Sequence, residues 1–231
     1  MTRLRKKAFA FQAFFFSVLM LATVSVCLGA GEILFEEDFE AGIDKNVWIP
    51  ADTWQIIDGT LDIDGGDEGY TVRNDFTDFE FSADFVIVAG YNAFIMRVQD
   101  AGNLYGHMVG DNDPLVWWHS KAGGVWAPEP RPIENASVPK LNVWYRMKFI
   151  VEGSKFTCLM GERGEELNEV DHLVGTWKHD AFDSGAIGFR ESGGEHCQYD
   201  NVLVTTIGFE PFAVGPEDNL STTWGDVKKI Y

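Results

Sequence analysis

The sequence is poor in cysteine, in basic residues and in helical periodicity, and each shortage narrows what the protein can be. Only three of the 231 residues are cysteine, and the chain has 18 Lys and Arg compared with 36 Asp and Glu. So few cysteines argue against a small disulfide-rich scaffold. A formal net charge of −18 at pH 7 argues against a surface that attracts nucleic acid or anionic lipid. We therefore expect a folded acidic domain with no nucleic-acid partner.

Long apolar runs are absent except at the N-terminus. Basic residues cluster within residues 3–7, an apolar stretch covers residues 8–28, and small residues follow at 29–31. This order predicts a signal peptide over residues 1–30, and so a secreted or periplasmic protein with no further membrane contact. An uncleaved anchor is the alternative, because a stretch of this length can just span a bilayer. Cleavage removes four positive charges and takes the net charge from −18 to −22.

Two cysteines, Cys158 and Cys197, remain once the leader is removed. An even pair in an oxidising compartment predicts a disulfide between them. Such a bridge would stabilise the fold by closing a long loop in the unfolded chain. Two buried free thiols are the alternative.

Apolar and polar residues alternate with a period of two through most of the chain, which is typical of half-buried strands. The longest alternating runs are 79–88 and 144–151, and Asp58-Gly59 has the composition of a two-residue hairpin turn. Many short strands joined by turns predict an all-β protein, folded as a sandwich or a barrel. Further strands are expected at 93–99, 104–109, 115–118, 186–190 and 198–205.

Prolines are few, and four of the eight fall within residues 126–139. That segment is predicted to be a surface loop, because proline cannot donate a hydrogen bond inside a sheet. A single domain is expected over residues 31–206. The tail over residues 207–231 begins with prolines and then carries a helix-start signal at Thr223, so a short terminal helix is expected there.

Several segments resemble those of the concanavalin A-like lectin/glucanase superfamily, including its laminin-G-like modules and its 3-keto-disaccharide hydrolase-like branch. The resemblance covers nearly the whole chain after the leader and implies an antiparallel jelly-roll sandwich of two sheets. One sheet is expected to be concave, with sugar often held on its concave face or rim. The segments that carry the resemblance are 34–42 (LFEEDFEAG), 54–61 (WQIIDGTL), 142–148 (NVWYRMK), 185–190 (GAIGFR) and 199–204 (YDNVLV).

The resemblance also implies that the first and last strands run side by side, often with a structural calcium ion between them. Asp38 and Asp200 occupy the matching positions, and backbone carbonyls or water would complete the ligand set. Glu36, Asp38 and Glu40 share one face of the first strand. They resemble the catalytic carboxylates of the superfamily's glucanases, but those lie on a strand in the middle of the domain. Cation binding or plain solvation is therefore preferred over catalysis for these three residues.

Aromatic and cationic side chains are candidates for contacts with a sugar. Trp118 or Trp126 offers a flat ring for the apolar side of a sugar, with packing in the loop or core as the alternative. Polar residues on nearby strands are expected to converge in one groove, where arginine forks bind hydroxyls or a carboxylate. Ordinary salt bridges are the alternative for the arginines. The ligand-binding candidates are Arg97, Gln99, Tyr105, His107, Trp118, Trp126 and Arg190.

The sequence thus predicts a secreted carbohydrate-binding module of lectin-like or adhesion type, with no catalytic residue assigned. One alternative is a hydrolase of glycosides or 3-keto-disaccharides that uses Arg97, His107 and a carboxylate such as Glu191 or Glu195. A second alternative is a laminin-G-like protein-interaction domain. The oligomeric state stays open.

Overall fold

The structure is a computed structural model that describes residues 31–110, 116–127, 131–133 and 138–209. All regular elements in these ranges are β-strands, and no helix among them is long and apolar enough to cross a membrane. The signal peptide and the terminal helix predicted from the sequence lie outside the described residues.

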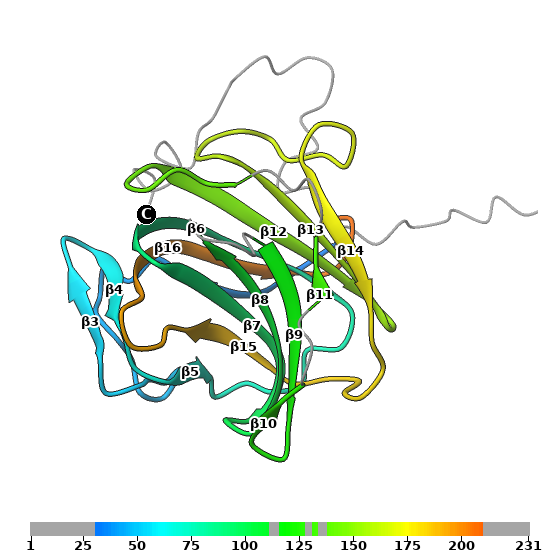
Figure 1. Cartoon of the computed structure of the whole chain (residues 1–231), viewed down its shortest axis with the longest axis horizontal. Coiled ribbons are helices and arrows are strands. Elements are labelled where there is room, and N and C mark those ends of the chain that lie inside the picture. Colours follow the sequence, from blue (N-terminus) through cyan, green and yellow to red (C-terminus); the bar gives the residue numbers. More distant parts are fainter. Residues whose placement is uncertain (1–30, 111–115, 128–130, 134–137, 210–231) are drawn as a thin grey trace, which may run out of the picture. The chain divides into compact units, whose positions relative to one another are not determined.

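The strands form two antiparallel sheets that pack face to face (Figure 1). Sheet A has the order β14-β13-β12-β6-β16-β4-β3, with β1 also paired to β16; sheet B has the order β10-β9-β8-β7-β15-β5-β2, with β11 also paired to β9. The predicted two-sheet sandwich is confirmed. The strands of sheet A are β1 (Ile33–Glu37), β3 (Trp54–Ile57), β4 (Thr60–Asp64), β6 (Phe79–Ala89), β12 (Trp144–Glu152), β13 (Lys155–Glu162), β14 (Leu173–Lys178) and β16 (His196–Thr205). The strands of sheet B are β2 (Trp48–Ile49), β5 (Glu68–Thr71), β7 (Tyr91–Asp100), β8 (Asn103–Gly110), β9 (Val116–Ala122), β10 (Val125–Trp126), β11 (Arg131–Pro132) and β15 (Ala186–Arg190).

The core between the sheets is built from the apolar half of each alternating run, and it is rich in phenylalanine. Phe81 and Phe85 on β6 are fully buried. Their rings each lie 5.7 Å from the ring of Phe94 on β7 in the opposite sheet, and Phe149 on β12 lies 5.2 Å from the same ring. The alternation of period two in the sequence therefore selects the residues that face the core.

The β3–β4 hairpin follows the turn predicted from its sequence. Asp58 and Gly59 have φ angles of 51° and 76°, as a type I′ turn requires at both central positions. The register places Ile57 opposite Thr60, so the loop between the strands is two residues long.

The segment predicted to be a loop begins at the last residue of β10 and contains β11, and both of these short strands pair with β9. Pro132 in β11 lies opposite Trp117 in β9. Proline is tolerated there because β11 lies at the edge of sheet B and needs no donor on its outer side. The proline content correctly excluded a central strand, but it did not exclude edge strands.

The predicted disulfide is not formed, because Cys158 and Cys197 are both free and buried. Cys158 lies on β13 and Cys197 on β16, and β12 and β6 run between these strands. Three strand spacings of about 4.8 Å separate them by roughly 14 Å, about twice what a disulfide can span. Burial raises the pKa of both thiols, which keeps them protonated and unreactive.

Candidate functional site

The central strands of sheet B turn alternate side chains toward the core and toward the outer face of the sheet. On β8, Tyr105 and His107 face the core, and Gly106 between them faces outward. The register pairs His107 with Trp118 on β9 and Gly106 with His119. Trp118 therefore faces the core, and His119 faces outward.

Three of the ligand-binding candidates are core residues in the structure. Tyr105, His107 and Trp118 are at most 1% exposed, so they offer no surface to a ligand. The Trp118 ring stacks on Trp177 with centroids 5.6 Å apart. His107 has no hydrogen-bond partner in the described part of the chain, and its burial lowers its pKa from 6.5 to about 3. The imidazole is therefore neutral at neutral pH.

Arg97 and Gln99 connect β7 to neighbouring loops. The register of β7 shifts beyond Met96, and Arg97 has a φ of 48°. This bulge turns its guanidinium inward, where Nη1 and Nη2 donate to the carbonyls of Phe182 and Thr77 at 3.0 and 2.8 Å. The Gln99 amide donates to the carbonyl of Ser184. Both side chains are thus used to hold loops in place.

The two carboxylates of the hydrolase alternative, Glu191 and Glu195, both lie in the β15–β16 loop. Glu191 is fully buried and accepts a hydrogen bond from the hydroxyl of Tyr199. Burial raises the pKa of Glu191 well above 4.5, which favours the neutral acid. Glu195 accepts the backbone N–H of Ser192. Within the described residues, neither lies beside Arg97 or His107.

The remaining candidates, Trp126 and Arg190, meet on the outer face of sheet B. The Trp126 ring is half-buried, and it stacks on His119 with centroids 4.7 Å apart. The Arg190 guanidinium carbon and the Lys121 nitrogen lie 5.3 and 5.5 Å from the ring centroid. Glu68 binds both cations, at 2.7 Å from Lys121 and 3.4 Å from Arg190. We refer to these five residues as the Trp126 cluster.

The ion pair between Lys121 and Glu68 reveals the curvature of sheet B. Lys121 is on β9 and Glu68 on β5, with β8, β7 and β15 between them. In a flat sheet these strands would lie roughly 19 Å apart, which is farther than the two side chains can reach together. Sheet B therefore curls toward its outer face, and Figure 1 shows the bend of β9. The Trp126 cluster lies across this concave face.

His119 is a residue that the sequence argument missed. Its Nε2 lies 2.8 Å from the carbonyl oxygen of Ala127. A carbonyl can only accept, so Nε2 carries a proton, and in the neutral imidazole Nδ1 then keeps the lone pair. Trp117, His119 and Lys121 occupy alternate positions of β9, on the opposite face from Trp118. This alternation could have identified the His119 side chain as outward-facing.

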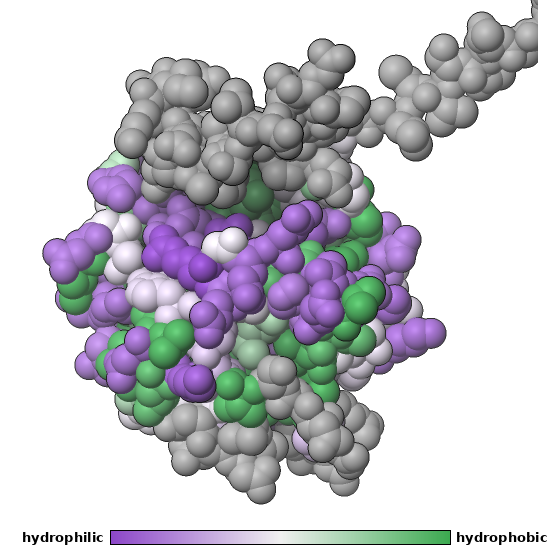
Figure 2. Space-filling view, turned by 90° about the horizontal axis from the view of Figure 1, so that it is seen from above, coloured by the Kyte–Doolittle hydropathy of each residue, from purple (hydrophilic) through white to green (hydrophobic). Residues whose placement is uncertain are grey.

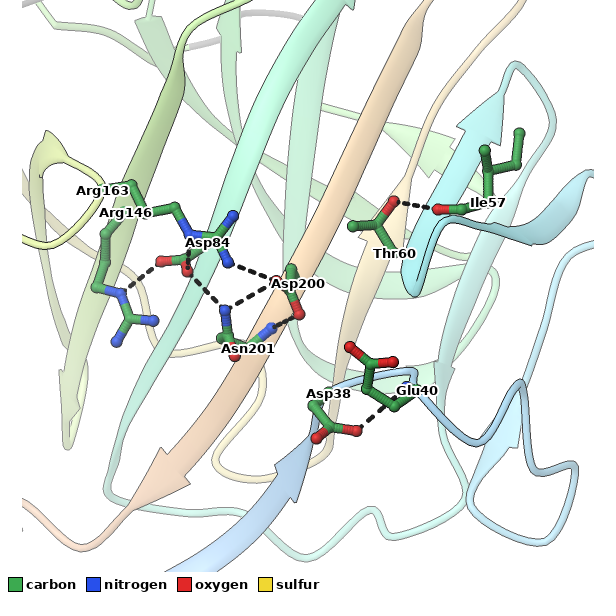
Figure 3. A network of polar contacts seen from close by, with 9 residues as sticks. All are labelled: Asp38, Glu40, Ile57, Thr60, Asp84, Arg146, Arg163, Asp200 and Asn201. Atoms are coloured by element: carbon green, nitrogen blue, oxygen red, sulfur yellow. Dashed lines mark hydrogen bonds and ion pairs between the residues drawn. The ribbon is translucent and has the colours of Figure 1, made fainter. Parts of the chain in front are cut away.

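The outer face of sheet A carries a second polar network, centred on Asp84 (Figure 3). Asp84 pairs with Arg146 at 2.6 Å and with Arg163 at 2.9 Å. Arg163 also pairs with Asp200 at 2.6 Å, and Asn201 donates to both carboxylates. Figure 2 looks onto the molecule from above and shows hydrophilic residues gathered in the middle of that face. Each carboxylate here has its own cation, so the network is satisfied internally.

This network bears on the predicted calcium ion. β1 and β16 do run side by side, and Asp38 at the end of β1 accepts the N–H of Glu40 at 3.2 Å. Asp200, however, is already bound by Arg163 and Asn201 (Figure 3). No group of three or more His, Cys, Asp or Glu in the described ranges is placed to hold a metal. Arg163 supplies a positive charge at Asp200 in the described structure, and the calcium ion stays a prediction.

The two antiparallel sheets, with sheet B concave on its outer face, form a sandwich with the concanavalin A-like fold. The profile of the family described as the 3-keto-alpha-glucoside-1,2-lyase-like domain matches residues 34–205, which is most of the chain. The protein belongs to this family. No curated protein matches the sequence.

Solved structures share the fold at low sequence identity. The carbohydrate-binding module CBM66 from Bacillus subtilis matches with a TM-score of 0.54 and 20% identity, over 69% of this chain and 95% of that one. A protein of unknown function with a galectin-like fold from Bacillus subtilis matches with a TM-score of 0.54 and 15% identity, over 76% and 96%. The xylan beta-1,4-xylosidase from Bacillus halodurans matches with a TM-score of 0.52 and 13% identity, over 73% of this chain and 38% of that one. These likenesses establish the fold alone.

Proposed function

We propose that this protein binds carbohydrate on the concave outer face of sheet B. The observation that carries the proposal is Trp126, a half-buried indole held on that face by His119. An aromatic ring binds the apolar C–H side of a sugar, and nearby polar groups fix the hydroxyls. Lys121, Arg190 and Glu68 stand around the ring as donors and acceptor. The predicted signal peptide would deliver the domain to where extracellular polysaccharides occur.

Isothermal titration with a panel of neutral and acidic oligosaccharides tests this proposal. Trp126→Ala should weaken the binding of any ligand found by at least tenfold, about 1.4 kcal/mol. Trp144→Ala is the matched control, because Trp144 is also half-buried and has the Arg163 guanidinium 4.8 Å from its ring, but lies on sheet A. The proposal fails if no sugar binds, or if the two substitutions have equal effects.

A second candidate function is the removal of a C1 substituent from a 3-keto-glycoside, which family membership favours. The ketone at C3 acidifies the C2 hydrogen. A base can take that proton, whereupon a C1–C2 double bond forms, the C1–oxygen bond breaks and the proton passes to the departing alkoxide. The lone pair on Nδ1 of His119 is the available base, and the charges of Lys121 and Arg190 would stabilise the enolate oxygen.

Release of p-nitrophenol from a p-nitrophenyl 3-keto-α-glucoside measures this activity. Wild-type protein should release it, and His119→Gln should lose most of the rate while Trp144→Ala keeps it. Inert wild-type protein would rule out this second candidate and leave the binding proposal standing.

A further inference from the structure

The Trp126 cluster differs in charge from the rest of this acidic protein. The whole chain has 36 acidic and 18 basic residues. In the cluster, Lys121 and Arg190 share the single carboxylate of Glu68, and His119 is the only other titratable member. The excess of cations lies on the face proposed to bind sugar.

Arg190 is held in place with its two terminal nitrogens available. Its Nε contacts Glu68, and its guanidinium lies near the Trp126 ring. Within the described part of the chain, Nη1 and Nη2 have no hydrogen-bond partner, and the side chain is 20% exposed. A planar guanidinium oriented by an aromatic ring and by one acid is suited to grip a carboxylate with two parallel hydrogen bonds.

Glu68 can neutralise only one of the two cations. Its side chain is 4% exposed, and those of Lys121 and Arg190 are 15% and 20% exposed. A partly buried positive charge without a matching anion is costly, because it has lost much of its hydration. An anionic group on the ligand would complete this arrangement.

We propose that the sugar bound on this face is a uronic acid, whose carboxylate binds the Nη groups of Arg190 and the ammonium of Lys121. The inference rests on the proposed function and adds the class of sugar to it. The net negative charge of the protein opposes anionic ligands at long range, but salt screens this repulsion beyond about 8 Å. The contacts within the cluster are shorter than that.

Titration calorimetry with oligogalacturonate and with its methyl-esterified form, at fixed ionic strength, isolates the carboxylate. Glucuronate-containing disaccharides and their glucose analogues form a second matched pair. The acidic member of at least one pair should bind ten times more tightly or better. Arg190→Gln should reduce that preference to about threefold or less, because it weakens binding of the acidic member more than binding of the neutral member.

Arg73→Gln is the control, since it changes the net charge equally at an exposed Arg73–Asp75 pair and should leave the preference intact. If Arg190→Gln does not fold, Arg190→Lys keeps the charge, removes the fork and should lose most of the preference. Equal or tighter binding of the neutral members overturns this inference alone. Absence of binding by every sugar overturns the proposed function as well.

Discussion

At the scale of single residues, two buried ionisable groups couple the stability of the protein to pH in opposite directions. His107 is kept neutral by burial, with its pKa lowered to about 3, and Glu191 is kept protonated by burial. Both pKa shifts are caused mainly by the loss of hydration rather than by a charged neighbour. Each can be tested with one substitution.

His107→Leu should flatten the loss of stability at acidic pH. The unfolded chain takes up a proton at this histidine below pH 6.5, and the folded chain does so only near pH 3. The stability of the wild type should therefore fall by about 2 kcal/mol relative to the variant between pH 7.5 and pH 5. Urea denaturation at the two pH values measures the difference. Identical pH dependence in both proteins would contradict a buried, neutral His107.

Glu191→Gln should have the opposite effect. The raised pKa of Glu191 means that the folded chain holds this proton where the unfolded chain, with an ordinary pKa of 4.5, has lost it. The resulting stabilisation is complete below pH 4.5 and declines as the pH rises toward the folded pKa. The variant should therefore gain stability over the wild type between pH 4.5 and pH 8 in the same denaturation experiment. A gain that does not change with pH would show that the proton is not involved.

Asp84→Ala should be strongly destabilising, because it leaves Arg146 and Arg163 without their shared buried partner. Removal of one member of a buried ion pair typically costs about 3–5 kcal/mol. The matched control is Asp75→Ala, which breaks an Arg–Asp contact of the same 2.6 Å length in which both side chains are exposed. That change should cost about 1 kcal/mol or less. Similar losses in the two variants would contradict the structural role of the Asp84 network.

At the scale of elements, the sequence predicted the strands better than the faces that they present. The run 186–190 is a strand with those bounds, and the Asp58-Gly59 turn forms as predicted. The alternation showed that Tyr105 and His107 share a face, but not that this face is the core. Both faces of sheet B bury apolar residues, so the pattern alone could not distinguish them. The alternation of apolar and polar residues also gives no sign of the bulge at Arg97.

The turn between β3 and β4 provides a test at this scale. Gly59→Ala should cost about 1 kcal/mol or more, because a residue with a Cβ is strained at a φ of 76°. Gly193→Ala is the control, since an added Cβ there meets no atom within 4 Å and the φ is not positive; it should change the stability by about 0.5 kcal/mol or less. Thermal unfolding of the two variants measures the difference. Equal losses would contradict the assigned turn.

At the scale of the whole molecule, the curvature of sheet B assembles the candidate site. Lys121 and Glu68 are 53 residues apart in sequence, and no local pattern indicates that they meet. The sequence identified Trp126 and Arg190 as candidates one by one, from composition and strand position. Their partners depend on how far the sheet curls, which the packing of both sheets determines. The fold was thus predictable from local patterns, whereas the membership of the site was not.

The proposed binding of sugar at Trp126, on the concave face of sheet B, can be observed directly. The indole N–H signals of the eight tryptophans report on it directly in a ¹H–¹⁵N NMR titration with the oligosaccharides above, assigned with Trp126→Phe and Trp144→Phe. If sugar binds at Trp126, the Trp126 signal should move most, while Trp144 on sheet A and the buried Trp54 stay in place. Movement of the Trp144 signal with Trp126 unchanged would contradict it.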